Sequence, residues 1–137
     1  MAHVLSLVTG LPIEEAECER FVSSDANGAV VTFRGVIRNH DHGTAVSGLE
    51  YSAHPEAERF LRQCCLIVAE EAGAPVAAVH RTGSLKIGDV ALFAAVGTAH
   101  RGDAFSACAH LVDLIKTRVP IWKRQHLTGG TTEWVGL

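Results

Sequence analysis

Apolar residues recur along this chain with two different periods, which predict short strands separated by three helices. Runs rich in β-branched and aromatic residues predict strands at 3–8, 29–38, 46–53, 76–83 and 90–99. Apolar residues at helical spacing predict helices over 12–22, 55–73 and about 103–118. Two short terminal strands, 121–127 and 131–137, are expected around a Gly129-Gly130 turn.

The ends of these segments carry residues that favour the same boundaries. Pro12 and Pro55 suit the first turn of a helix, Gly73 suits a helix C-terminus, and Pro120 must follow the third helix. Gly35 inside a strand predicts a bulge or a close approach of another backbone. Strands 29–38 and 46–53 are expected to form a hairpin with a long loop, and the nearly all-apolar strand 90–99 is expected to be central. This order predicts an α+β domain with a mainly antiparallel sheet and about three helices.

The composition is that of one globular domain covering 1–137. Apolar residues make up 47% of the chain and charged residues 20%, which argues against disorder. No apolar run reaches the roughly 18–20 residues needed to span a bilayer, and the start lacks the basic segment of a signal peptide. We therefore expect a cytoplasmic protein. The four cysteines lack zinc-type spacing and are expected to be buried, reduced thiols.

Positive charge is concentrated near the C-terminus of a mildly acidic chain. The net charge is −3, but residues 100–125 hold five basic and two acidic residues, a local +3 that leaves −6 elsewhere. A cationic island on an anionic protein favours binding of a small anion. A nucleic-acid surface would spread positive charge over a whole face, so nucleic-acid binding is not expected.

Lys116 is the first candidate for chemistry within this island. At 100° per residue, Phe105, Cys108, Val112, Ile115 and Val119 form one stripe of the third helix, and Lys116 lies about 20° from Phe105. A lysine at such an apolar margin loses solvation, which lowers its pKa toward a value useful for catalysis. Like charge would lower it further, and the expected sources are Arg118, Arg124, His100 and Arg101. The alternative is an ordinary surface lysine at a helix end.

Other residues could bind an anion. His100-Arg101 lies between a buried strand and a helix start, which would make a cradle for an anion, although a solvated pair is equally compatible. Arg38 ends a strand and could clamp a phosphate. The run 40–42 (HDH) has a faint metal-ligand pattern but reads better as a turn, and His80 has no evident partner. Nucleotide-loop, hydrolase and zinc motifs are absent, so neither a nucleotide cofactor nor a structural zinc is expected.

Five segments in order resemble the family of molybdopterin synthase catalytic (large) subunits, nearly end to end from about Leu11 to Val135. They are GAVVTFRGVIRNHDHG (28–43), LEYSAHPEA (49–57), HRTGSLKIGD (80–89), TAHRGDAFSAC (98–108) and LIKTRVPIWKR (114–124). The resemblance implies an α/β-hammerhead-type fold and a homodimer within a heterotetramer. The other subunit would be a small ubiquitin-like sulfur carrier.

The resemblance also implies an activity. The carrier's C-terminal Gly-Gly thiocarboxylate would deliver sulfur to cyclic pyranopterin monophosphate, forming the dithiolene of molybdopterin. This sulfurtransferase would need no metal or organic cofactor, because the sulfur comes from the partner protein. A non-catalytic module that binds a phosphorylated ligand or a ubiquitin-like tail is the alternative. Retention of two lysines favours the enzyme, because a phosphate clamp could use arginines alone.

The family's functional residues fall on positions already singled out. Lys116 matches the principal catalytic residue and Lys123 the second essential lysine. Arg38, His100 and Arg101 match the group that binds the pterin phosphate. Backbone beside the pocket is expected from four further residues, namely Val36, Ile37, Arg124 and Gln125.

Overall fold

A computed structural model describes residues 2–41, 43–128, 130 and 132–136. The predictions for His42, Gly129 and the ends of strand 131–137 lie outside these residues. Along the chain the elements are β1 (Val4–Thr9), α1 (Glu15–Val22), β2 (Ala29–Val36), β3 (His40–Asp41), β4 (Thr44–Ala53), α2 (Ala57–Ala72), β5 (Val76–Arg81), β6 (Gly83–Lys86), β7 (Val90–Thr98), α3 (Arg101–Arg118), β8 (Ile121–Leu127) and β9 (Thr132–Gly136).

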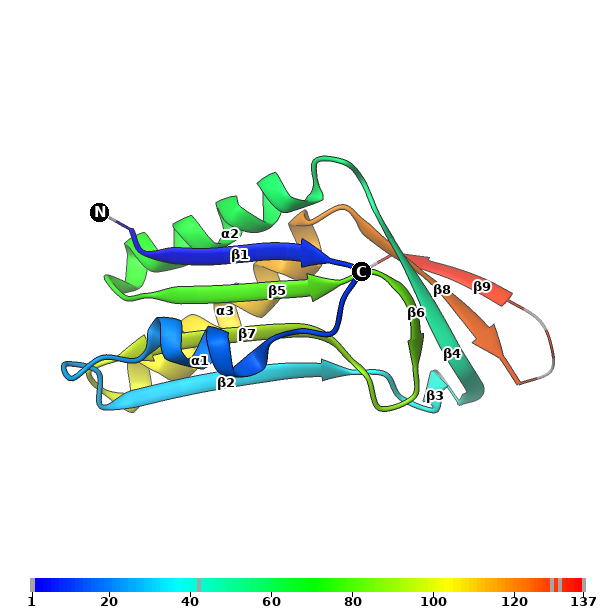
Figure 1. The fold of residues 1–137 in the computed structure, drawn as a ribbon, viewed down its shortest axis with the longest axis horizontal. Coiled ribbons are helices and arrows are strands. Elements are labelled where there is room, and N and C mark those ends of the chain that lie inside the picture. The colour runs from blue at the N-terminus through cyan, green and yellow to red at the C-terminus, as the bar shows by residue number, and fades with distance from the viewer. Residues whose placement is uncertain (1, 42, 129, 131, 137) are drawn as a thin grey trace.

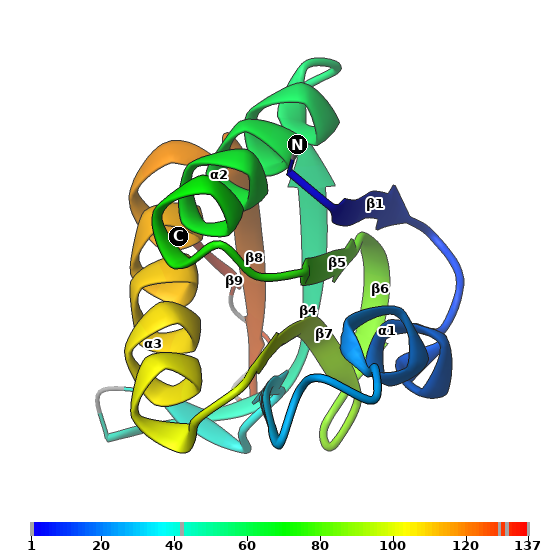
Figure 2. The ribbon, with the colours of Figure 1, turned by 90° about the vertical axis from the view of Figure 1, so that its left-hand side faces the viewer.

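The first sheet has four strands in the order β1-β5-β7-β2. Strand β1 is parallel to β5, while β5–β7 and β7–β2 are antiparallel. Helices α2 and α3 pack on one face and α1 packs on the other (Figure 2). Because both faces are covered, β7 can be apolar along its length, and eight of its nine residues are buried. The predicted internal position of this strand is confirmed.

The second sheet lies at one end of the first and carries half of the cleft described below (Figure 1). It runs β3-β4-β8-β9, with β6 also paired to β4, and these pairs are antiparallel. Strand β2 and helix α3 both run toward this sheet, so their C-terminal ends meet it (Figure 1). Residues from the ends of several elements are thereby brought together.

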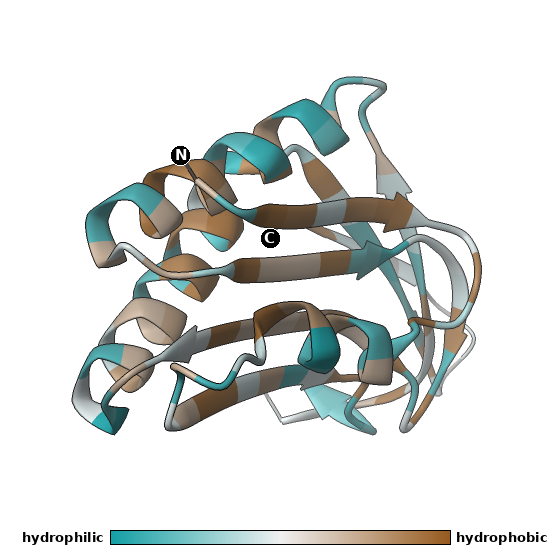
Figure 3. Ribbon diagram, turned by 60° about the vertical axis from the view of Figure 1, so that its left-hand side comes forward, coloured by the Kyte–Doolittle hydropathy of each residue, from teal (hydrophilic) through white to brown (hydrophobic). Residues whose placement is uncertain are grey.

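One apolar core joins the two sheets to the helices (Figure 3). Leu61 of α2, Ile115 of α3, Leu85 of β6 and Ile121 of β8 are each no more than 2% exposed. Burial of each such side chain contributes roughly 1.5–3 kcal/mol. A smaller cluster lies under α1, and all four cysteines are buried and free, as expected.

Most predicted boundaries are confirmed. Helix α3 ends at Arg118, before Pro120, and Gly73 adopts a left-handed conformation (φ 60°) after α2. The β2–β7 register shifts at Gly35, as expected for a bulge. Helix α1 is shorter than predicted and begins at Glu15 instead of Pro12. Within the described residues, no helix is long and apolar enough to cross a membrane.

Three expectations were wrong. Strands β2 and β4 do not form a hairpin, because β2 pairs with β7 and β4 pairs with β3, β6 and β8. The short strands β3 and β6 were not predicted, and β3 lies in the long loop after β2 whereas β6 follows β5. Phe105 is 61% exposed, because the buried face of α3 is centred on residues that contact α2 and the sheet, such as Leu111 and Ile115.

Candidate functional site

A cleft of about 330 Å³ lies where the two sheets meet the end of α3. Eight segments contribute to it, namely β2, the chain after it, β3, β4, β7, β8 and the ends of β5 and α3. The polar and charged lining residues are Arg34, Arg38, His40, Asp41, Tyr51, His80, Lys116, Lys123 and Gln125. The site is therefore a cationic cleft with an apolar base, which suits a small anionic ligand.

The β4–β8 pairing determines which side chains of β8 enter the cleft. Tyr51 lies opposite Lys123 and Leu49 opposite Gln125, so these four share one face of the sheet. Arg124 is on the opposite face because successive side chains of a strand alternate. Its guanidinium stacks over the ring of Trp134, 5.5 Å from the ring centre. Arg124 and Gln125 were both expected beside the pocket, and of these two only Gln125 lines the cleft.

Lys116 lies in the last turn of α3 and faces the cleft beside Lys123. Although the residue as a whole is exposed, the cleft walls partly shield its ammonium group. Burial lowers the pKa of Lys116, and the positive charge of Lys123 lowers it further. The direction of this shift agrees with the sequence analysis, but the like charge comes from Lys123 and not from the arginines and His100 that were expected to supply it.

His80 is a cleft residue for which the sequence indicated no partner. It is 2% exposed at the end of β5, and its ring lies edge-on to Tyr51 with centroids 5.0 Å apart. Nδ1 donates a hydrogen bond to the Arg81 carbonyl oxygen (2.8 Å), so Nε2 is the unprotonated nitrogen. Burial lowers the pKa of His80 to about 4, and Lys116 lowers it too. The imidazole is therefore neutral near pH 7.

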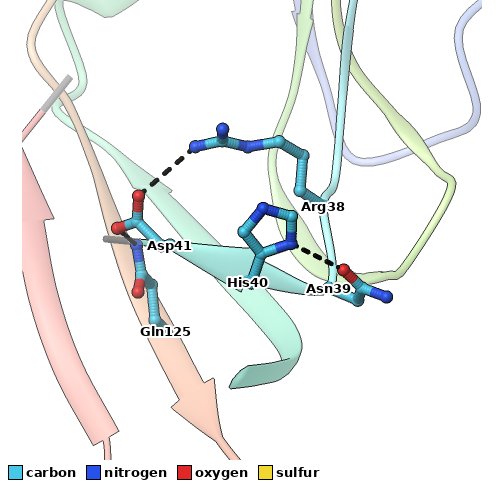
Figure 4. Close-up of polar contacts among 5 residues, drawn as sticks. All are labelled: Arg38, Asn39, His40, Asp41 and Gln125. Carbon is cyan, nitrogen blue, oxygen red and sulfur yellow. Dashed lines mark hydrogen bonds and ion pairs between the residues drawn. The ribbon is translucent and has the colours of Figure 1, made fainter. Parts of the chain in front are cut away.

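Arg38 follows β2, and its exposed side chain contacts Asp41 within a small group of polar residues (Figure 4). Its Nη2 contacts Oδ1 of Asp41 at 3.3 Å, and Nε2 of Gln125 donates to Oδ2 of Asp41 at 2.6 Å. His40 Nδ1 donates to the side-chain oxygen of Asn39 at 2.8 Å. The sequence drew attention to Arg38 but gave no sign that Asp41 connects it to Gln125. Asp41 and Gln125 are 84 residues apart along the chain.

His100 and Arg101 are far from this cleft within one chain. Both are exposed at the start of α3, whereas Lys116 lies in its last turn. At 1.5 Å per residue, Arg101 and Lys116 are about 22 Å apart along the helix axis. The structure thus groups Arg38, Lys116, Lys123 and Gln125 with Val36 and Ile37, and it does not bring His100 and Arg101 to them in the same chain.

The remaining charges of the described cleft lining do not form a set of metal ligands. Arg34 is paired with Glu15 at 2.9 Å, and Asp41 is the one acidic residue that the described part of the lining contains. Among the described residues, no group of three or more His, Cys, Asp or Glu side chains could hold a metal ion. Fold and site together define an α+β protein with a two-lysine, arginine-containing cleft for a small anionic ligand.

Comparison with known proteins identifies the family. The family model described as "MoaE protein" matches residues 8–118, and the chain belongs to this family. A molybdopterin synthase catalytic subunit from Nostoc sp. is 36% identical over 133 residues, covering 95% of this chain and 81% of the relative. The chain is therefore related along most of its length to catalytic subunits of molybdopterin synthase.

Solved structures share the fold. The crystal structure of molybdopterin synthase from Staphylococcus aureus superposes with a TM-score of 0.88 at 35% identity, over 95% of this chain and 96% of that one. The expected α/β-hammerhead-type fold is thus confirmed. A Helicobacter pylori chain at 17% identity, with a TM-score of 0.70 and coverage of 96% and 89%, shares the fold; it comes from a complex of subunits 1 and 2 of molybdopterin-converting factor.

Replacing Lys123 with Gln should raise the pKa of Lys116 toward the ordinary lysine value of about 10.4, because a neighbouring positive charge is removed. The pH dependence of the Lys116 side-chain nitrogen shift in NMR measures this. The matched control is Lys86→Gln, since Lys86 is exposed and lies outside the cleft lining. A Lys116 pKa that is unchanged in Lys123→Gln would contradict the proposed coupling.

The buried His80 should make the fold sensitive to acid. Its pKa is about 4 in the folded protein and 6.5 as the ordinary value, so the unfolded chain binds the extra proton between these pH values. Stability is therefore lost as the pH falls from 6.5 to 4, by about 2–3 kcal/mol from this group. Urea unfolding at several pH values should show a shallower dependence for His80→Gln. An identical slope in both proteins would rule out His80 as the source.

Proposed function

We propose that this cleft is the active site of a sulfurtransferase that converts cyclic pyranopterin monophosphate to molybdopterin. The sulfur donor would be the thiocarboxylated C-terminus of a small ubiquitin-like carrier protein. The observation that carries the proposal is that Lys116 and Lys123 line one cleft together with Arg38, and that burial and the charge of Lys123 lower the pKa of Lys116. Membership of the MoaE family supports the same reaction.

The residues divide the chemistry by their charge and position. Arg38, with a planar fork of N–H donors, suits the phosphate of the pterin. Lys116 would act as general acid and base, because a lysine with a lowered pKa can release and recover a proton near neutral pH. Opening of the cyclic phosphate and departure of the carrier's carboxylate both require such proton transfer. Lys123 would stabilise the negative charge that develops beside it.

The carrier tail must reach the cleft from the solvent. A Gly-Gly terminus is slender enough to enter a narrow opening, and the two lysines supply positive charge at the place where its thiocarboxylate arrives. The H. pylori complex of two subunits, built on the same fold, is compatible with a partner of this kind. The buried free cysteines suit a reducing compartment, so we place the reaction in the cytoplasm.

A second copy of the chain would supply His100 and Arg101. Near these residues Phe105 is 61% exposed and Val30 is 42% exposed, and an apolar groove runs between α3 and β2. Apolar surface of this kind is typical of an interface. A two-fold axis that sets two α3 helices antiparallel would bring the start of one helix beside the end of the other. Each cleft would then combine Arg38 and the lysines with His100 and Arg101 of the other copy.

The alternative function is a binding module that holds a phosphorylated ligand or a ubiquitin-like tail without reaction. The two readings differ in one measurable quantity, the mass of the carrier. Incubation of the protein with thiocarboxylated carrier and cyclic pyranopterin monophosphate should replace the carrier's terminal sulfur with oxygen. Loss of sulfur only when both protein and pterin are present supports the enzyme, and an unchanged carrier mass supports the binding module.

Replacing Lys116 with Ala should reduce product formation by several orders of magnitude, because the group proposed to release and recover the proton would be removed. The fold and carrier binding should be retained, since the side chain is exposed overall. Fluorescence of the product pterin after oxidation measures turnover, and circular dichroism measures folding. Lys86→Ala is the matched control, and near-normal turnover in Lys116→Ala would refute the assignment.

A mixed dimer tests whether the site is shared between copies. Lys116→Ala and Arg101→Ala should each be inactive alone. After the two variants are unfolded together and refolded, half of the dimers should be mixed, and each mixed dimer should contain one intact site. About a quarter of wild-type activity should return. No recovery in a sample shown by mass spectrometry to contain mixed dimers would place both residues in the same copy's site.

A further inference from the structure

Asp41 is the one carboxylate within the described lining of a cleft whose other charged residues are Arg34, Arg38, Lys116 and Lys123. Its side chain is only 14% exposed. A carboxylate in this position repels any anion that enters, and the partly enclosed surroundings strengthen that repulsion. The presence of Asp41 therefore opposes the proposed use of the cleft, unless the carboxylate has a role of its own.

The contacts of Asp41 with Gln125 and Arg38 differ in how firmly the partner is held (Figure 4). Oδ2 accepts a hydrogen bond of 2.6 Å from Gln125, which is 2% exposed and set in the middle of β8. Backbone pairing of β3 with β4 places Asp41 opposite Thr44. On the other side, Oδ1 contacts Arg38 at 3.3 Å, and the Arg38 side chain is 66% exposed. The carboxylate is therefore anchored by the sheet, whereas the guanidinium can move away from it.

We propose that Asp41 is a specificity-determining residue that occupies Arg38 as an internal counter-anion until a phosphate on the correct ligand replaces it. This proposal rests on the proposed function, since it takes the cleft as the phosphate site. Free inorganic phosphate must give up the Arg38–Asp41 attraction and also approach the carboxylate. A pterin phosphate offsets this cost with the contacts of its ring system elsewhere in the cleft. Asp41 thereby keeps abundant simple anions out of the cleft.

Asp41→Asn separates the charge of this residue from its structural contact. The asparagine side chain has nearly the same size, and its carbonyl oxygen can still accept the hydrogen bond from Gln125. The attraction to Arg38 and the repulsion of anions are lost. Asp25→Asn is a matched control, because it makes the same change of net charge on an exposed residue of the turn before β2, at the far end of that strand from the cleft.

Inorganic phosphate is the probe, titrated into the full-length protein in a calorimeter at constant ionic strength. Its dissociation constant should be roughly fivefold lower for Asp41→Asn than for the wild type, which corresponds to the upper range for a solvent-accessible ion pair. Asp25→Asn should match the wild type. A merely structural role for Asp41 predicts weaker phosphate binding in the variant, so an equal or higher dissociation constant would overturn the proposal.

A second background tests whether Asp41 acts through Arg38. In Arg38→Gln the guanidinium is absent, so adding Asp41→Asn should improve phosphate binding by less than twofold. A full fivefold gain in that background would show that Asp41 does not act through Arg38 and would reject the proposed exchange. Because these titrations need neither carrier nor pterin, they remain informative if the sulfur-transfer assay fails. The proposed function and the role of Asp41 can thus fail separately.

Discussion

The site depends on the apolar junction that fixes the two sheets against the helices. Leu61, Leu85, Ile115 and Ile121 come from four different elements, and each is no more than 2% exposed. Their burial holds the end of α3 against β8, and so keeps two lysines near each other although their charges repel. Like charges at close range are costly, and no ion pair of either lysine is found among the described residues to compensate this contact. Hydrophobic free energy from the core maintains the electrostatic condition that the chemistry requires.

The same junction explains why the neutral residues of the cleft matter. His80 and Tyr51 are buried against each other, and burial raises the pKa of Tyr51 to about 12 while it lowers that of His80. Both groups are uncharged near pH 7, so they neither cancel nor add to the positive charge of the cleft. They give the lysines a polar but neutral surrounding, in which a lowered lysine pKa can persist.

Local signals allowed much of the fold to be predicted from sequence. The apolar character of β7, the turn chemistry of Gly73 and Pro120, and the bulge at Gly35 each depend on near neighbours in the chain. Strand pairing does not depend on near neighbours in the chain. The alternation of residues in β2 and β4 specifies which face of each strand is buried, but it does not specify which strand pairs with it. Phe105 was misplaced for a related reason. A helical wheel shows which residues share one side of a helix, but it does not show which of them the sheet and α2 cover.

The site was predictable to a similar degree. Charge clustering and the helical wheel singled out Lys116, and strand ends singled out Arg38. Asp41 and His80 could not be assigned partners, because Gln125 and Tyr51 meet them only through the two-sheet topology. The division of β8 into cleft-facing Lys123 and outward Arg124 follows from strand alternation once the register with β4 is known.

The connection between α3 and β8 has a consequence for how the chain can vary. Only Val119 and Pro120 separate the two elements, and both positions are constrained: Val119 is 5% exposed, and the carbonyl oxygen of Pro120 accepts a hydrogen bond from the His54 backbone. Proline also fixes its own backbone angle φ. An inserted or deleted residue here would shift β8 by one position and exchange the faces of Lys123 and Arg124. Length changes should therefore be excluded from this link, although sequence changes that preserve its geometry are open to evolution.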